Sequence, residues 1–78
     1  MEITTRQWID KIALALNVAS PSDDGVDQLL SLAAVAAHAS DRTAAPVTCW
    51  IAAHADMDLS EVLVVAQRQA RELEGGTS

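Results

Sequence analysis

The residues with the clearest chemical potential lie in the middle of the chain, where His38, Arg42 and Thr48 surround a short polar turn. His38 and Arg42 are four residues apart, a spacing that places two side chains on one face of a helix. Thr48 falls in the first turn of the next expected helix, where free backbone N–H groups can hold an anion. These three residues, called the anion corner below, are therefore candidates for binding a phosphate or carboxylate of a nucleotide or pterin.

A purely structural interpretation explains the same residue types. In this interpretation Arg42 caps carbonyl groups at the end of the preceding helix, while His38 and Thr48 brace the turn. We favour it over ligand binding, because helix ends use such residues whether or not a ligand is present.

Metal binding and catalysis have less support. His38 and His54 are the only histidines, and no cluster of cysteines or carboxylates supplies the further ligands that a metal site needs. His54 stands near the end of an expected helix, where an imidazole can cap carbonyl groups. No nucleophile has a recognisable neighbouring base, and no glycine-rich phosphate loop occurs. We therefore expect no catalytic residue, no metal, no cofactor and no enzymatic activity.

Helix start signals show which elements must position these residues. Thr4 with Gln7, and Asp58 with Glu61, have the spacing of capping boxes. Pro46 suits the first turn of a helix. Together with the apolar periodicity, these signals predict helices at about residues 5–17, 25–40, 46–55 and 59–73, with Asn17 ending the first and a frayed tail at 75–78.

The periodicity also predicts which side of each helix faces the core. The expected core faces are Trp8, Ile9, Ile12, Ala15 and Leu16; Val26, Leu29, Leu30, Ala33, Ala36 and Ala37, flanked by Leu32, Ala34 and Val35; Val47, Trp50, Ile51 and His54; and Leu59, Val62, Leu63, Ala66, Ala70 and Leu73. The second helix is apolar on most sides, which is typical of a central element. The sequence thus predicts an all-α fold, a compact antiparallel bundle of four short helices that forms a single domain over residues 1–78.

A few residues have individual expectations. Trp8 and Trp50 are expected to anchor the core, and Cys49 is expected to be a buried thiol. Leu14 and Val64 point away from the core faces of their own helices. They are predicted to line an interface with a protein partner or a second copy.

Composition limits the class of partner. The chain has 78 residues and a net charge of −6, and its five basic residues do not cluster, which argues against nucleic-acid binding. No apolar run approaches the roughly 20 residues that span a bilayer, and the N-terminus does not resemble a signal peptide. We therefore expect no membrane association and a cytoplasmic location. A core without Phe or Tyr is thin, so self-association would stabilise it.

From Ala36-Ala37-His38 through Arg42-x-Ala44-Ala45-Pro46-Val47-Thr48, the chain resembles a small bacterial helical family of unknown function. That family occurs alone or as a C-terminal extension of molybdenum cofactor guanylyltransferase-like proteins. Trp8-Ile9-Asp10 and the run from Val26 to Ala33 are similar to its first two helices. Thr43 stands where the family pattern has a proline, and the segment from Trp50 to Asp56 lacks the family's glycines.

The resemblance implies an accessory role near molybdopterin guanine dinucleotide synthesis. It does not imply catalysis, because the nucleotidyltransferase machinery belongs to the other domain. Two functions are thus predicted. The first is a non-catalytic module that docks on a molybdenum cofactor enzyme or on itself, and the alternative is a small-molecule binder that uses the anion corner.

Overall fold

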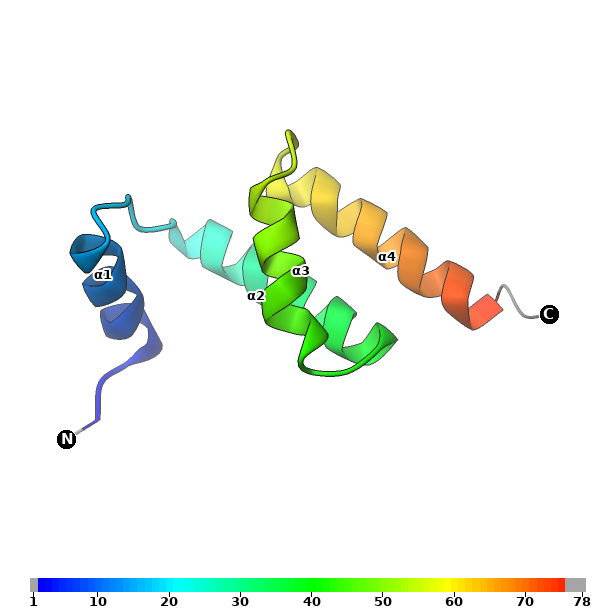
Figure 1. Cartoon of the computed structure of the whole chain (residues 1–78), viewed down its shortest axis with the longest axis horizontal. Coiled ribbons are helices and arrows are strands. Elements are labelled where there is room, and N and C mark those ends of the chain that lie inside the picture. The colour runs from blue at the N-terminus through cyan, green and yellow to red at the C-terminus, as the bar shows by residue number, and fades with distance from the viewer. Residues whose placement is uncertain (1, 76–78) are drawn as a thin grey trace.

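The computed structural model of the chain describes residues 2–75, which form four helices and no strand (Figure 1). The helices are α1 (Thr5–Ala15), α2 (Asp23–Ala39), α3 (Ala44–Ala53) and α4 (Leu59–Gly75). The predicted all-α class with four helices is therefore confirmed. Both predicted ends of α2 and α3, and the C-terminal ends of α1 and α4, lie one or two residues from the observed ones. Gly75, expected in the frayed tail, is the last residue of α4, and residues 76–78 lie outside the described part.

Local hydrogen bonds explain where α1 begins and ends. The Gln7 amide donates to Thr4 Oγ1 at 3.0 Å and the Thr4 amide donates to Gln7 Oε1 at 2.8 Å, which confirms the first capping box. At the other end, Asn17 adopts the left-handed conformation with φ 58°. Its amide bonds Leu14 O at 3.1 Å, and the Val18 amide bonds Ala13 O at 2.9 Å. This pair of bonds is a Schellman motif, so Asn17 ends the helix as predicted.

The starts of α2 and α4 also follow side-chain caps. Ser22 Oγ accepts a hydrogen bond from the Gly25 amide at 3.0 Å, and Asp23 and Asp24 complement the helix dipole in the first turn of α2. The Asp58 amide donates to Glu61 Oε1 at 3.4 Å, which is one half of the predicted box at α4. The polar run before α2 thus serves to cap a helix.

Helix α2 is the centre of the fold, as its composition predicts. It packs against both α3 and α4, and these are the main contacts between helices. Figure 1 shows that the chain reverses direction from α2 to α3 and again from α3 to α4, so that α2 and α4 run the same way. Helix α1 stands apart, beyond the N-terminal end of α2.

The arrangement is more open than the compact bundle that the sequence predicts. The molecule measures 49 × 31 × 18 Å, and its radius of gyration is 14.2 Å. A compact chain of this length would have a radius of gyration of about 11.5 Å. The difference arises because α1 does not join the other three helices in one core.

The core lies where α2 meets its two neighbours, and it is small. Leu32 is only 1% exposed, and Ala36 and Ala52 are the other buried residues of the described chain. Small alanines let the helices approach closely, so one large side chain fills the centre. Leu32 was predicted to flank this core, but it lies at the centre. Leu30 was predicted to belong to the core, which is wrong because Leu30 is exposed. The core face is rotated because α2 packs against two helices rather than one.

Helix α3 turns its predicted core face outward. Val47, Trp50, Ile51 and His54 are all exposed, and Trp50 retains 64% of its accessible surface. The opposite face, with Ala52, packs on the core. The sequence pattern does not show which face of α3 meets the core, because α3 has no charged residue to mark the solvent side. The small side chains of the other face permit closer packing.

The expectations for the tryptophans and the cysteine are corrected accordingly. Trp8 is 52% exposed, so neither tryptophan anchors the core. Cys49 is half-buried rather than buried, and its Sγ lies 4.0 Å from the Leu29 carbonyl oxygen. Helix α1 contains no buried residue at all, although its apolar stripe was expected in the core. Leu73, near the C-terminal end of α4, was also expected in the core but is exposed.

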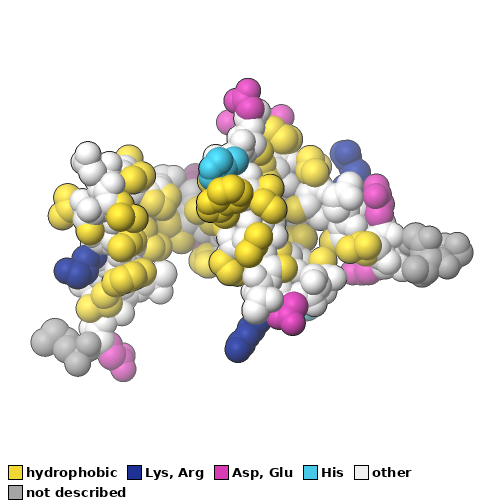
Figure 2. Space-filling model, viewed as in Figure 1, with side chains coloured by type: hydrophobic (Ala, Val, Ile, Leu, Met, Phe, Trp, Pro, Cys, Tyr) yellow, Lys and Arg dark blue, Asp and Glu magenta, His cyan; other side chains and the backbone are white. Residues whose placement is uncertain are grey.

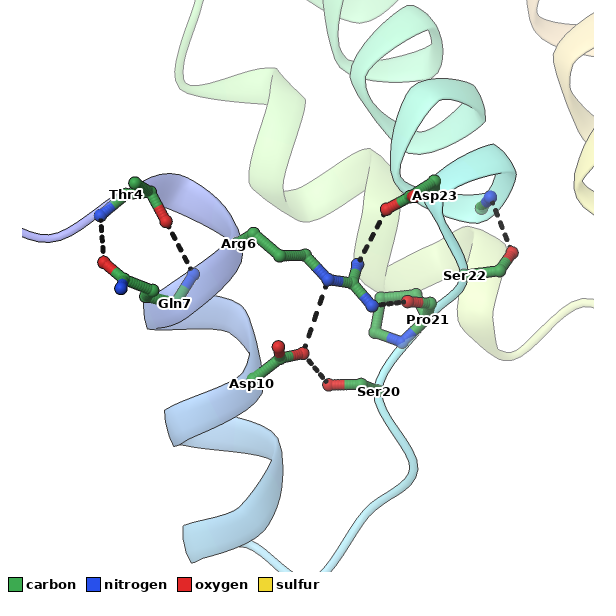
Figure 3. A network of polar contacts seen from close by, with 9 residues as sticks. Thr4, Arg6, Gln7, Asp10, Ser20, Pro21, Ser22 and Asp23 are labelled. Carbon is green, nitrogen blue, oxygen red and sulfur yellow. Dashed lines mark hydrogen bonds and ion pairs between the residues drawn. The ribbon is translucent and has the colours of Figure 1, made fainter.

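Polar contacts of Arg6 hold α1 next to the start of α2 (Figure 3). Arg6 Nη2 donates to the Pro21 carbonyl oxygen at 2.7 Å. Arg6 Nε lies 3.5 Å from Asp10 Oδ1, and Nη1 lies 3.7 Å from Asp23 Oδ1, too far for a hydrogen bond. Ser20 Oγ donates to Asp10 Oδ1 at 2.7 Å. The guanidinium therefore joins α1, the connecting segment and α2.

Substitution of Arg6 by methionine should release α1 without unfolding the core. The carboxylates that pair with Arg6 are largely exposed, so we expect a loss of less than about 1 kcal/mol in the unfolding free energy. Hydrogen exchange of the α1 amides should become faster, while the α2 amides near Leu32 keep their protection. Lys11→Met, which removes an exposed charge from the same helix, is the control. If the α1 amides of Arg6→Met exchange as slowly as those of the wild type, Arg6 does not hold α1 against the start of α2.

Candidate functional site

The structure places the residues of the anion corner in different surroundings. His38 is exposed near the end of α2, and Arg42 is exposed in the turn that follows. Thr48 is half-buried in α3 and lines an apolar cavity of about 200 Å³ with Leu32 and Val62. His38 instead borders a shallow groove between α2 and α4, as described next. The anion corner stays a prediction.

The groove beside His38 is the most polar hollow near the predicted corner. It has a volume of about 400 Å³ and is also lined by Gln67, Arg71 and Glu74 of α4. Arg71 is thus the cation that shares a groove with His38, and sequence spacing gave no sign of this pairing. Glu74 lies in the same groove and would oppose an anion there.

The turn between α2 and α3 is organised by Asp41. Asp41 Oδ1 accepts hydrogen bonds from the Thr43 amide at 3.1 Å and the Thr43 hydroxyl at 3.3 Å. The Asp41 carbonyl oxygen accepts the Ala44 amide at 2.8 Å. This is an Asx turn, and the Asp-x-Thr pattern just before a helix could have revealed it. Asp41, which the sequence analysis did not single out, therefore braces the corner.

His54 caps the end of α3, as predicted. Its Nδ1 lies 2.8 Å from the Trp50 carbonyl oxygen, and because a carbonyl only accepts, Nδ1 carries the proton. The imidazole and the Trp50 ring lie with centroids 4.0 Å apart and planes at 33°. Within residues 2–75, no three His, Cys, Asp or Glu side chains gather closely enough to hold a metal ion.

A larger feature is the apolar surface formed by α1 and α3. Figure 2 shows hydrophobic side chains gathered over both helices on one face of the molecule, with a hollow between them. Exposed large side chains at helical spacing supply this surface. We define the α1–α3 surface as Trp8, Ile12, Val47, Trp50 and Ile51. Large exposed apolar areas of this kind mark sites of interaction.

The total accessible area supports this interpretation. The chain has an accessible surface of 6172 Å². A folded monomer of its mass, 8.2 kDa, would expose about 4,500 Å². The four terminal residues outside the described part could account for about 600 Å² at most. The excess over a typical monomer is therefore about 1,000–1,600 Å².

The α1–α3 surface also has the chemistry of an interface core. Helix α3 carries no charged residue from Ala44 to Ala53, so it can be covered without removing a charge from water. Interface cores are depleted in charges and enriched in aromatic side chains, and tryptophan often contributes most of the binding energy. Trp50 and Trp8 satisfy this description.

The residues predicted to form an interface are both exposed. Leu14 of α1 is 83% exposed. Val64 of α4 is also exposed and borders an open hollow of about 390 Å³ with Met57 and Val65. Their role at an interface stays a prediction. The sequence did not point to Trp50 and Ile51 as surface residues, because their spacing looks like that of core residues.

Comparison with known protein families gives a match over most of the chain. The model of a family described as a domain of unknown function (DUF6457) matches residues 2–75. No curated protein and no solved structure matches the chain. In the described part of the chain, no helix has both the length and the apolar composition to cross a bilayer.

Proposed function

The chain belongs to the family described as a domain of unknown function (DUF6457), and we propose that it is a non-catalytic interaction module. Its α1–α3 surface binds a protein. The observation that carries this proposal is the outward-facing apolar side of α3. This side has no charged residue, and its largest side chain is the largely exposed Trp50. Binding a protein there removes apolar area from water without burying a charge.

We further propose that this module works beside an enzyme of molybdopterin guanine dinucleotide synthesis. The support is the resemblance of the segment from Ala36 to Thr48 to domains attached to molybdenum cofactor guanylyltransferase-like proteins. Catalysis then belongs to that enzyme, and this domain supplies affinity and position.

A photo-crosslinking amino acid at position 50 tests the proposal in cells. With the protein that carries this chain expressed in its own host, a photoreactive phenylalanine analogue in place of Trp50 should form protein adducts. The same analogue in place of Leu73, an exposed apolar residue of α4, is the control. Adducts at position 50 well above those at position 73 support the proposal. Equal or absent adducts at position 50 overturn it.

The alternative function, binding of a phosphate-bearing ligand, has one favourable observation. His38 shares an open groove with Arg71, so two groups that can carry positive charge border the same hollow. Thr48 lies in a different, apolar cavity, which makes a shared anion site with His38 less favourable.

An NMR titration with GTP, GMP and inorganic phosphate separates the two functions. We expect no saturable shift of the His38 ring, the Arg42 side chain or the Thr48 amide at about millimolar ligand, since His38 and Thr48 border different hollows. A weak shift limited to His38 and Arg71 would reflect the open groove, and Arg71→Gln should remove it. Saturating shifts at His38, Arg42 and Thr48 together, lost in Arg42→Ala, would replace the proposal with a ligand-binding function.

A further inference from the structure

We infer that the α1–α3 surface is covered by a second copy of this chain. In the resulting symmetric dimer, α1 of each copy packs against α3 of the other. This inference rests on the proposed function and names the partner.

The first argument is that one chain carries two uncovered helix faces that cannot meet within it. Helix α1 has no buried residue, and α3 turns Val47, Trp50 and Ile51 to solvent. Arg6 holds α1 beside the start of α2 through Pro21, away from α3 (Figure 1). In a two-fold dimer a contact from α1 to the α3 helix of the other copy occurs twice, so one arrangement covers all four faces.

The second argument is the area available. The chain exposes about 1,000–1,600 Å² more than a typical folded monomer of its mass. If each copy buried this excess, the dimer would bury about 2,000–3,200 Å² in total. Stable homodimers that depend on their interface bury about 2,000–5,000 Å². The excess is thus the area that a second copy would cover.

The third argument concerns charge, and it also distinguishes a second copy from a basic partner. The centre of the contact contains the uncharged helix α3, so no buried ion pair is needed to match two identical surfaces. Each chain nevertheless carries a net charge of −6, so two copies repel each other at long range. Salt screens this repulsion and should strengthen the dimer, whereas it would weaken binding to a basic protein.

Analytical ultracentrifugation of the 78-residue chain tests the inference. We expect a mass of twice 8.2 kDa at about 100 μM, and a dimer dissociation constant that falls when NaCl is raised from about 50 to 500 mM. Ile12→Asp, on the α1 part of the surface, should raise that constant at least about 30-fold. Leu73→Asp, on α4, should leave it within about threefold. Circular dichroism verifies that both variants stay helical. The mass of the wild-type chain tests the dimer even if a variant fails to fold.

The outcomes separate this inference from the proposed function. A helical chain with a mass of 8.2 kDa at about 1 mM overturns the dimer. So does a dimer that Ile12→Asp leaves intact, since the contact would then lie elsewhere. In either case the crosslink at position 50 still tests the interaction module, because an adduct with a different protein would preserve that proposal. An adduct of twice the protein's own mass supports both.

Discussion

Replacement of Leu32 by alanine is expected to lower the unfolding free energy by about 2–5 kcal/mol. Leu32 is 1% exposed and is the one large side chain that is fully buried in the described chain. The substitution removes its transfer free energy and enlarges a cavity already bordered by Thr48 and Val62. A core this small rarely supplies more than about 3–5 kcal/mol, so this loss is a large share of the total stability.

Urea unfolding followed by far-ultraviolet circular dichroism measures this effect. Leu73→Ala makes the same chemical change at a residue that is 66% exposed, and it should alter stability by about 0.5 kcal/mol or less. Both proteins should be measured at one concentration, because dimer formation makes apparent stability depend on concentration. Equal stabilities of the two variants would contradict a core centred on Leu32.

Substitution of Trp50 by aspartate is expected to weaken dimer formation at least about 100-fold. The aspartate removes a large aromatic contact and places a charge where the apolar faces of two copies meet. The fold of one copy should survive, because Trp50 is 64% exposed and the buried face of α3 is formed on the other side, at Ala52. The His54 ring loses its stacking partner, while the carbonyl group that it caps remains.

The dimer dissociation constant of Trp50→Asp can be obtained by sedimentation equilibrium, with Trp50→Phe as the matched control. Phenylalanine keeps an apolar ring and should change the constant by less than about tenfold. Trp50→Asp that dimerises as well as the wild type would show that α3 lies outside the contact. A helical signal retained in both variants excludes unfolding as the cause of a loss.

The helix starts were predictable because they depend on short-range chemistry. Thr4 with Gln7 and Asp58 with Glu61 are recognisable capping pairs. The left-handed Asn17 ends α1, where the Asn17 amide bonds the carbonyl three positions back and the Val18 amide bonds the carbonyl five positions back. Such signals do not depend on what packs against the helix. Secondary structure could therefore be read from the sequence to within two residues.

The packing was not predictable from the same information. Apolar spacing shows that α1 has an apolar face, but it does not show whether the cover comes from the same chain. In α3 the uncharged sequence has no polar face to mark the solvent side, so the face with Trp50 was wrongly assigned to the core. Sequence patterns identify surfaces that avoid water, and a second molecule can cover such a surface as well as the chain's own core can.

The candidate site was predictable to a limited extent. His38 and Arg42 are close in sequence and both are exposed, as a binding role requires. The surroundings of Thr48 depend on how α3 is rotated about its axis. The packing of alanines around Leu32 sets that rotation. Arg71 joins His38 only through the contact of α2 with α4, which no local pattern encodes.

The most direct measurement of the central claim is an isotope-filtered NOE experiment on an equal mixture of ¹³C-labelled and unlabelled chains. If α1 of one copy packs on α3 of the other, cross-peaks should connect the Ile12 methyl groups of labelled chains to the Trp50 ring of unlabelled chains. These cross-peaks should disappear when Trp50→Asp supplies the unlabelled component. A dimer with no cross-peak between α1 and α3 would contradict the proposed contact.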